Sequence, residues 1–262
     1  MRLEAGLDTL EWPRSTVVPK PRYRDRFFLG MAVTAAVSVL VGFARTYYLK
    51  TLFPTPSFPL LFHIHGALFT AWLLVLVLQV SLVAARKTAL HRRVGWIGLS
   101  LMVAMVVTGT LVSIAAARGH GPVSAAVRQG EMTWVRVGMA PMEVLLMNLA
   151  TMLLFAVFAA AGLAFRGRPD AHKRFMMLAT IGLLPAAIGR AAITLLGVFH
   201  PALFFGSIAV FVLGMAIHDR RSAGHVHPAT LWGGLILIAS FPARMALAKT
   251  GLWLTAAAWL IG

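Results

Sequence analysis

The amino-acid sequence contains seven apolar stretches that are each long enough, or nearly so, to cross a lipid bilayer. A transmembrane helix needs about 20 predominantly apolar residues. Because 59% of the 262 residues are hydrophobic and only 12% are charged, the composition excludes an ordinary soluble domain. Strand-like alternation is absent, so we predict an all-α, polytopic membrane helical bundle with about seven transmembrane helices. The predicted spans are roughly 27–49, 59–84, 94–117, 140–165, 175–198, 202–217 and 229–248.

Basic residues are distributed unevenly between the two sides of the predicted bundle. Lys and Arg number six in residues 1–26, four in 85–93, four in 166–174 and two in 218–228, whereas the opposite connections and the C-terminal tail hold five. Cytoplasmic loops of membrane proteins carry such an excess, so we predict an N-in/C-out topology in a bacterial inner (plasma) membrane. The net charge of +16 then reflects topology and contact with anionic lipids, and nucleic-acid binding is not expected.

The two ends of the chain differ from the spans between them. Residues 1–26 carry charges and prolines and lack the apolar core of a signal peptide, so we predict a cytoplasmic N-terminal tail. The seven-helix transmembrane domain is expected over residues 27–250. Residues 251–262 are apolar but too short to cross, and with Trp253 and Trp259 they are typical of an interfacial helix. The alternative is that they form part of an eighth crossing.

Three arginines lie inside predicted spans, namely Arg45, Arg190 and Arg244. Charge within a bilayer is expensive and often marks function, and the predicted topology places all three near the outer face together with Glu143. A buried guanidinium favours a planar anion such as a carboxylate or a phosphate. We therefore predict an outer anion-binding pocket in which Glu143 neutralises one arginine. Alternatively, Arg45 and Arg244 lie near enough to the membrane surface for their guanidinium groups to reach water. This explanation does not suit Arg190, which lies deeper.

Histidines near the same face suggest a second chemistry. His65 and His200 are candidate ligands of one haem, with the arginines on its propionates, whereas a two-haem wire across the bilayer is not expected because the histidines lie at interfaces. His63 is a candidate metal ligand. Residues i and i+2 point about 200° apart on a helix, so we expect His63 and His65 to face different sides. The chain has no cysteine, which excludes thiolate ligation and cysteine-held iron–sulfur clusters.

A further group of polar residues lies at the cytoplasmic ends of the spans. The second and fourth spans are each followed by a short basic turn and then by His with a basic pair, in LHRRVGWIG and AHKRFMML. His91 and His172 therefore occupy equivalent places in two helical hairpins. Imidazoles with a carboxylate suit zinc, iron or copper, so His91, His172, Asp219 and His227 are candidate metal ligands. The alternative is that the basic residues only stop the translocation of the chain through the membrane, and that the histidines beside them bind nothing.

Five runs carry a resemblance that extends from about Arg24 to the end of the chain: YYLKTLF, LLFHIHGALFTAW, LHRRVGWIG, AHKRFMMLATIGLLPAAI and VHPATLWGG. They resemble a group of bacterial multi-pass membrane proteins of uncharacterised function, and this resemblance implies only the fold. The run AHKRFMMLA is also similar to the His-Lys-Arg-x-Met stretch of YozB-like membrane proteins, which are implicated in haem–copper oxidase assembly. That resemblance covers one hairpin and implies haem, copper or respiratory biology around His172.

The sequence leaves two functions to be distinguished. The first is an inner-membrane protein that holds a histidine-ligated cofactor, haem or a transition metal, for redox chemistry or oxidase biogenesis. The second is a binding or transport protein that captures an anionic small molecule or lipid through the outer arginines. Neither pattern decides whether the protein is an enzyme. The lipid bilayer is the expected partner, and a second copy or a respiratory protein is a further candidate.

Overall fold

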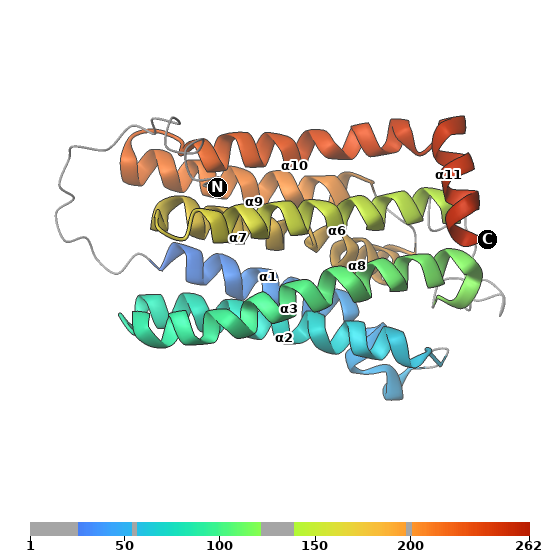
Figure 1. Cartoon of the computed structure of the whole chain (residues 1–262), viewed down its shortest axis with the longest axis horizontal. Coiled ribbons are helices and arrows are strands. Elements are labelled where there is room, and N and C mark those ends of the chain that lie inside the picture. Colours follow the sequence, from blue (N-terminus) through green and yellow to red (C-terminus); the bar gives the residue numbers. More distant parts are fainter. Residues whose placement is uncertain (1–25, 54–56, 122–138, 198–200) are drawn as a thin grey trace, which may run out of the picture.

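The computed structural model describes residues 26–53, 57–121, 139–197 and 201–262. These residues form helices and connecting turns, with no strand among them. Within them, seven helical stretches are long and apolar enough to cross a membrane, and they lie side by side as a bundle (Figure 1). This confirms the predicted all-α polytopic fold. The long helices are α1 (Phe27–Phe43), α2 (Leu60–Ala84), α3 (Thr88–Ala115), α6 (Pro141–Ala164), α7 (Pro169–Ile181), α8 (Leu184–Leu196), α9 (Pro201–Ala223) and α10 (Pro228–Leu247).

Exposed basic residues gather at one end of the bundle, which we name the basic end. It holds the start of α1 and the turns that join α2 to α3, α6 to α7 and α9 to α10, all on the left in Figure 1. An N-in topology needs this arrangement, although the orientation in the membrane stays a prediction. The exposed basic residues include Arg86, Lys87, Arg92, Arg93, Arg166, Arg168, Arg220 and Arg221.

Several helices extend beyond their apolar stretches towards the basic end. The third was expected from residue 94 but begins at Thr88, and the sixth was expected to end at residue 217 but continues to Ala223. Arg and Lys are good helix formers, and a helix needs apolar side chains only where it contacts hydrocarbon. The polar ends of the bundle are therefore helical, and they carry His91 and Asp219 on regular helix faces.

The fifth span is broken near its middle. Helix α7 ends at Ile181, and α8 begins at Leu184 with Pro185 in its first turn. Proline fits there because the first turn of a helix has no internal partner for its N–H. Pro242, in contrast, lies inside α10, which continues to Leu247.

The broken α7–α8 span is the most buried of the seven. Helix α1 packs against α8, and Gly42 approaches so closely that a Cβ there would collide with the backbone of Ala187. Small residues commonly permit such close approach between membrane helices. Large apolar side chains such as Leu74, Val210 and Trp232 are exposed on the outside of the bundle, as expected for a surface that contacts lipid.

A short apolar helix, α11 (Gly251–Ile261), lies crosswise at the end opposite the basic end (Figure 1). The indole Nε1 of Trp253 donates to the carbonyl of Met142 at 2.9 Å, and Arg118 donates to the carbonyl of Ile261 at 2.9 Å. Trp259 remains 82% exposed. A helix in the membrane interface must run across the transmembrane helices, as α11 does. The interfacial position of residues 251–262 itself stays a prediction.

Candidate functional site

Two adjoining cavities open in the half of the bundle away from the basic end. The first, of about 230 Å³, lies between α1, α2, α3, α6 and α8. The second, of about 210 Å³, lies between α6, α8, α9 and α10. Both are lined by Thr46, Asn148, Thr151 and Arg190. Because they share this wall, we treat them as one site and name it the arginine cavity.

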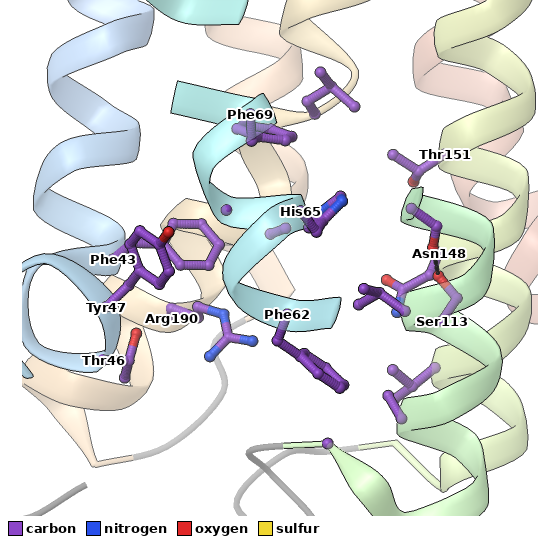
Figure 2. Close-up of a pocket in the computed structure, with 18 of the residues that line it drawn as sticks. Phe43, Thr46, Tyr47, Phe62, His65, Phe69, Ser113, Asn148, Thr151 and Arg190 are labelled. Carbon is purple, nitrogen blue, oxygen red and sulfur yellow. Dashed lines mark hydrogen bonds between the residues drawn. The ribbon is translucent and has the colours of Figure 1, made fainter. Parts of the chain in front are cut away.

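Arg190 reaches the arginine cavity from α8. In Figure 2 its guanidinium lies beside the α2 segment that carries Phe62 and His65. Its Cζ atom is 4.9 Å from the ring centroid of Phe43. No described residue forms an ion pair or a hydrogen bond with Arg190. A guanidinium has five N–H donors and does not lose its proton in proteins, so its charge is available to an anion in the cavity.

The end of α1 shapes one wall of the cavity. Its last turn widens into a π-helix, Ala44–Tyr48, a feature that occurs often at functional sites. The Tyr47 hydroxyl donates to the carbonyl of His63 at 3.1 Å, and Tyr48 shares a 2.8 Å hydrogen bond with Thr70. These bonds fix the turn against α2. The Thr46 hydroxyl oxygen is buried and has no hydrogen-bond partner among the described residues.

Arg244 lines the second cavity from α10 and is 8% exposed. Its guanidinium donates to Thr151 Oγ1 at 3.0 Å, to the Met147 carbonyl at 3.3 Å and to Ser240 Oγ at 2.9 Å. All of these acceptors are neutral. Arg244 is therefore fixed in place without a counter-charge from the described residues, and its bond to Thr151 connects it to the wall that holds Arg190.

The remaining polar groups of the cavity are imidazole, hydroxyl and amide groups. His65 lines it from α2, with Nδ1 3.3 Å from Thr108 Oγ1. Figure 2 shows Ser113 and Asn148 on the side opposite Arg190. Among the described lining residues of either cavity there is no Asp or Glu. The site thus combines aromatic and aliphatic walls with two guanidinium groups and several hydroxyl and amide groups.

Two residues predicted for this site lie elsewhere. The carboxylate of Glu143 accepts the backbone N–H of Ala140 at 2.9 Å and so caps its own helix. It does not line the cavity, and it forms no ion pair with Arg45, Arg190 or Arg244, so the expectation that Glu143 neutralises one of these arginines is wrong. Arg45 is exposed, with its Cζ 5.3 Å from the ring centroid of Phe53, and it does not line the cavity. The alternative that its head extends to water stays a prediction. His200 lies outside the described residues.

His63 and His65 face different sides of α2, as their spacing predicted. His65 faces the cavity, whereas the Nε2 atom of His63 is 3.4 Å from Lys50 Nζ and its ring lies 6.0 Å from that of Phe58. The two imidazoles therefore do not share one metal.

At the basic end, Asp219 is part of a buried ion pair. It accepts from the guanidinium of Arg174 through Nε, at 3.1 and 3.2 Å, and through Nη2. It also accepts from the Thr230 hydroxyl at 2.6 Å and from the backbone N–H of His227 at 3.1 Å. Because these donors occupy both carboxylate oxygens, the structure does not leave Asp219 free as a metal ligand.

His227 acts as the N-cap of α10. Its Nδ1 accepts the backbone N–H of Ala229 at 3.1 Å, which requires an unprotonated nitrogen. Burial, followed by the positive charge of Arg174, lowers the pKa of His227 to about 4. The ring is therefore neutral at physiological pH. Its role in the described structure is to cap a helix beside the Arg174–Asp219 pair.

His91 and His172 are brought together, with ring centroids 6.2 Å apart. Within the described parts of the chain, no group of three or more His, Cys, Asp or Glu side chains is placed to hold a metal ion.

The sequence predicted Arg190, Arg244 and His65 for the outer site but missed Thr46 and Thr151. Thr151 could have been found from the sequence, because it is a hydroxyl residue one helical turn from Asn148 and therefore lies on the same face of the helix.

Comparison with protein-family models, with curated proteins and with solved structures found no match to this chain.

Proposed function

We propose that the protein binds an anionic, largely apolar small molecule in the arginine cavity, with a carboxylate or phosphate group on Arg190. The observation that carries this proposal is a guanidinium that faces a cavity and has no acidic partner among the described residues. A charge in such surroundings is costly unless an anion offsets it. The aromatic and aliphatic walls suit the apolar part of an amphipathic ligand.

The acidic residues of the described chain support this proposal, since each has another role. Asp219 pairs with Arg174, Glu143 caps α6, and Asp170 is exposed and pairs with Lys173 at 2.7 Å. No Asp or Glu in the described ranges is left for Arg190 or Arg244. An anion from outside the described chain is therefore the natural counter-charge.

Binding of short amphiphiles to purified protein tests the proposal. We expect octyl phosphate and octanoate to bind more tightly than octanol, their neutral counterpart, as measured by isothermal titration calorimetry in a neutral detergent. Hydrogen bonds to charged groups contribute about 1.5–3 kcal/mol, so Arg190→Gln should weaken octyl phosphate binding roughly 10- to 100-fold, given about 1.4 kcal/mol for each factor of ten.

Arg45→Gln is the matched control, because it removes an exposed arginine that does not line the cavity. It should leave octyl phosphate binding unchanged. The proposal is wrong if octanol binds as tightly as octyl phosphate, or if Arg190→Gln behaves like Arg45→Gln.

A histidine-ligated haem is a second candidate for the same cavity. The observation in its favour is that His65 and Arg190 both line the cavity, which is the arrangement that axial ligation with a nearby propionate would use. Gently purified protein should then show a Soret band that His65→Ala removes. A colourless protein would exclude haem and would leave the proposal of anion binding untouched.

A further inference from the structure

The basic end carries a second candidate site, formed by two histidines from different hairpins. His91 lies in the first turn of α3 and His172 in the first turn of α7. Their ring centroids are 6.2 Å apart, and the ring planes are nearly perpendicular at 88°. Both side chains are partly buried. The site is separate from the arginine cavity, which neither histidine lines.

His172 is oriented by a hydrogen bond to the backbone. Its Nδ1 lies 2.7 Å from the carbonyl oxygen of Gly162 on α6. A carbonyl only accepts, so Nδ1 carries the proton and donates it. The neutral imidazole then has its lone pair on Nε2. Metal-binding histidines almost always have this arrangement, in which an outer partner fixes the tautomer and the ring direction.

Two buried side-chain atoms on α2 and α3 have no hydrogen-bond partner among the described residues. These are Nδ1 of His91 and Oε1 of Gln79. The backbone of Gln79 lies within hydrogen-bonding reach of the His91 ring. The side-chain nitrogen of Gln79 lies 3.6 Å from the position that a Cβ on Gly95 would occupy, one turn further along α3. Buried polar atoms without a partner are rare because each loses its hydration without compensation. The unpartnered imidazole nitrogen of His91 is an electron-pair donor.

The spacing of the two rings is compatible with one metal ion between them. A zinc–imidazole nitrogen bond measures about 2.0–2.1 Å, and the nitrogen lies roughly 1.1 Å from the ring centre. Two imidazoles on opposite sides of one ion therefore have centroids about 6 Å apart, close to the observed 6.2 Å. Imidazole nitrogens suit copper and zinc, whereas magnesium and calcium prefer sets of oxygen ligands.

We propose that His91 and His172 bind one copper or zinc ion at the basic end. The two histidines supply neutral nitrogen ligands from α3 and α7. The ion would connect the α2–α3 hairpin to the α6–α7 hairpin.

Metal titration of tag-free protein tests this site. Purified protein is titrated with Zn²⁺ and, under reducing conditions with a competing chelator, with Cu⁺, and Mg²⁺ serves as the negative control. We expect about one ion of zinc or copper per chain. His91→Ala and His172→Ala should each weaken binding at least tenfold. His225→Ala is the matched control, because His225 is exposed and its hydrogen bond among the described residues is the local one to Ala223. This variant should bind metal like the wild type.

The wild-type protein provides a second test in case the alanine variants do not fold. X-ray absorption of the metal-loaded wild type should show two imidazole nitrogens at the metal. Spectra without two imidazoles, binding that His225→Ala weakens as much as His91→Ala, or zinc and copper binding no tighter than that of Mg²⁺ would each overturn the proposal.

Discussion

Replacing Asp219 by alanine should destabilise the basic end strongly. The carboxylate is fully buried and accepts from Arg174, from the Thr230 hydroxyl and from the backbone N–H of His227. It therefore joins α7, α9 and the first turn of α10 at one point. In Asp219→Ala the guanidinium of Arg174 stays buried without its counter-charge, and two further donors lose their acceptor.

The expected magnitude follows from that burial. Removing one partner of a buried ion pair typically costs about 3–5 kcal/mol. Asp170→Ala is a matched comparison, because Asp170 contacts the same arginine, with Arg174 Nη1 and Asp170 Oδ1 3.5 Å apart. The Asp170 side chain is 71% exposed, and exposed pairs contribute about 0–1 kcal/mol. Its backbone carbonyl, which also accepts from Arg174 at 2.7 Å, is unchanged by the substitution.

Thermal unfolding of both variants in the same detergent measures the difference. We expect a large decrease in Tm for Asp219→Ala and a decrease of a few degrees or less for Asp170→Ala. Asp219→Asn should be intermediate, since the amide oxygen can still accept from Thr230. If Asp219→Ala and Asp170→Ala lower the Tm equally, then the buried ion pair does not hold these helices together and the argument from burial is refuted.

Three further predictions concern stability, packing and topology. The pKa of His227 is lowered from 6.5 to about 4, so the unfolded chain binds a proton that the folded chain does not, and stability should fall as the pH drops from about 6.5 to 4. This slope should be shallower in His227→Asn. Gly42→Ala should lower the Tm because its Cβ collides with the backbone of Ala187, whereas Gly30→Ala, with open space around it, should not. Reporter fusions in the three turns of the basic end should report the inside, and a fusion after Gly262 the outside; an inside report there would indicate an eighth crossing.

Hydropathy predicted the number and order of the membrane helices but not where they end. The apolar signal stops where lipid contact stops, and the helices continue into polar sequence at Thr88 and Ala223. The break at Pro185 was predictable because the missing N–H and the fixed ring act locally. Pro242 obeys the same local chemistry, yet α10 continues through it, because neighbouring helices and side chains can compensate for one lost hydrogen bond.

The sequence could predict a residue of the candidate site only where the depth of that residue in the membrane was enough to identify it. Arg190 stood out because it is the deepest charge in a predicted span. The prediction that Glu143 neutralises one of the outer arginines was wrong, because similar depth says nothing about the direction in which each helix faces. Glu143 caps α6 instead. The Arg174–Asp219 pair joins residues that are 45 positions apart in the chain, so only the packing of α7 against α9 reveals it.

Arg174 and Arg190 lie on the same broken span, and their contrast yields a last prediction. The fold neutralises Arg174 with a buried carboxylate and leaves Arg190 without one among the described residues. If Arg190 is kept for an anionic ligand, it destabilises the ligand-free protein, as functional charges commonly do. Arg190→Leu should therefore raise the Tm without ligand, even though it removes the contact with Phe43, and should abolish the stabilisation by octyl phosphate. A variant that is less stable than the wild type without ligand, yet keeps its response to octyl phosphate, would show that Arg190 is a structural residue and that the anion binds elsewhere.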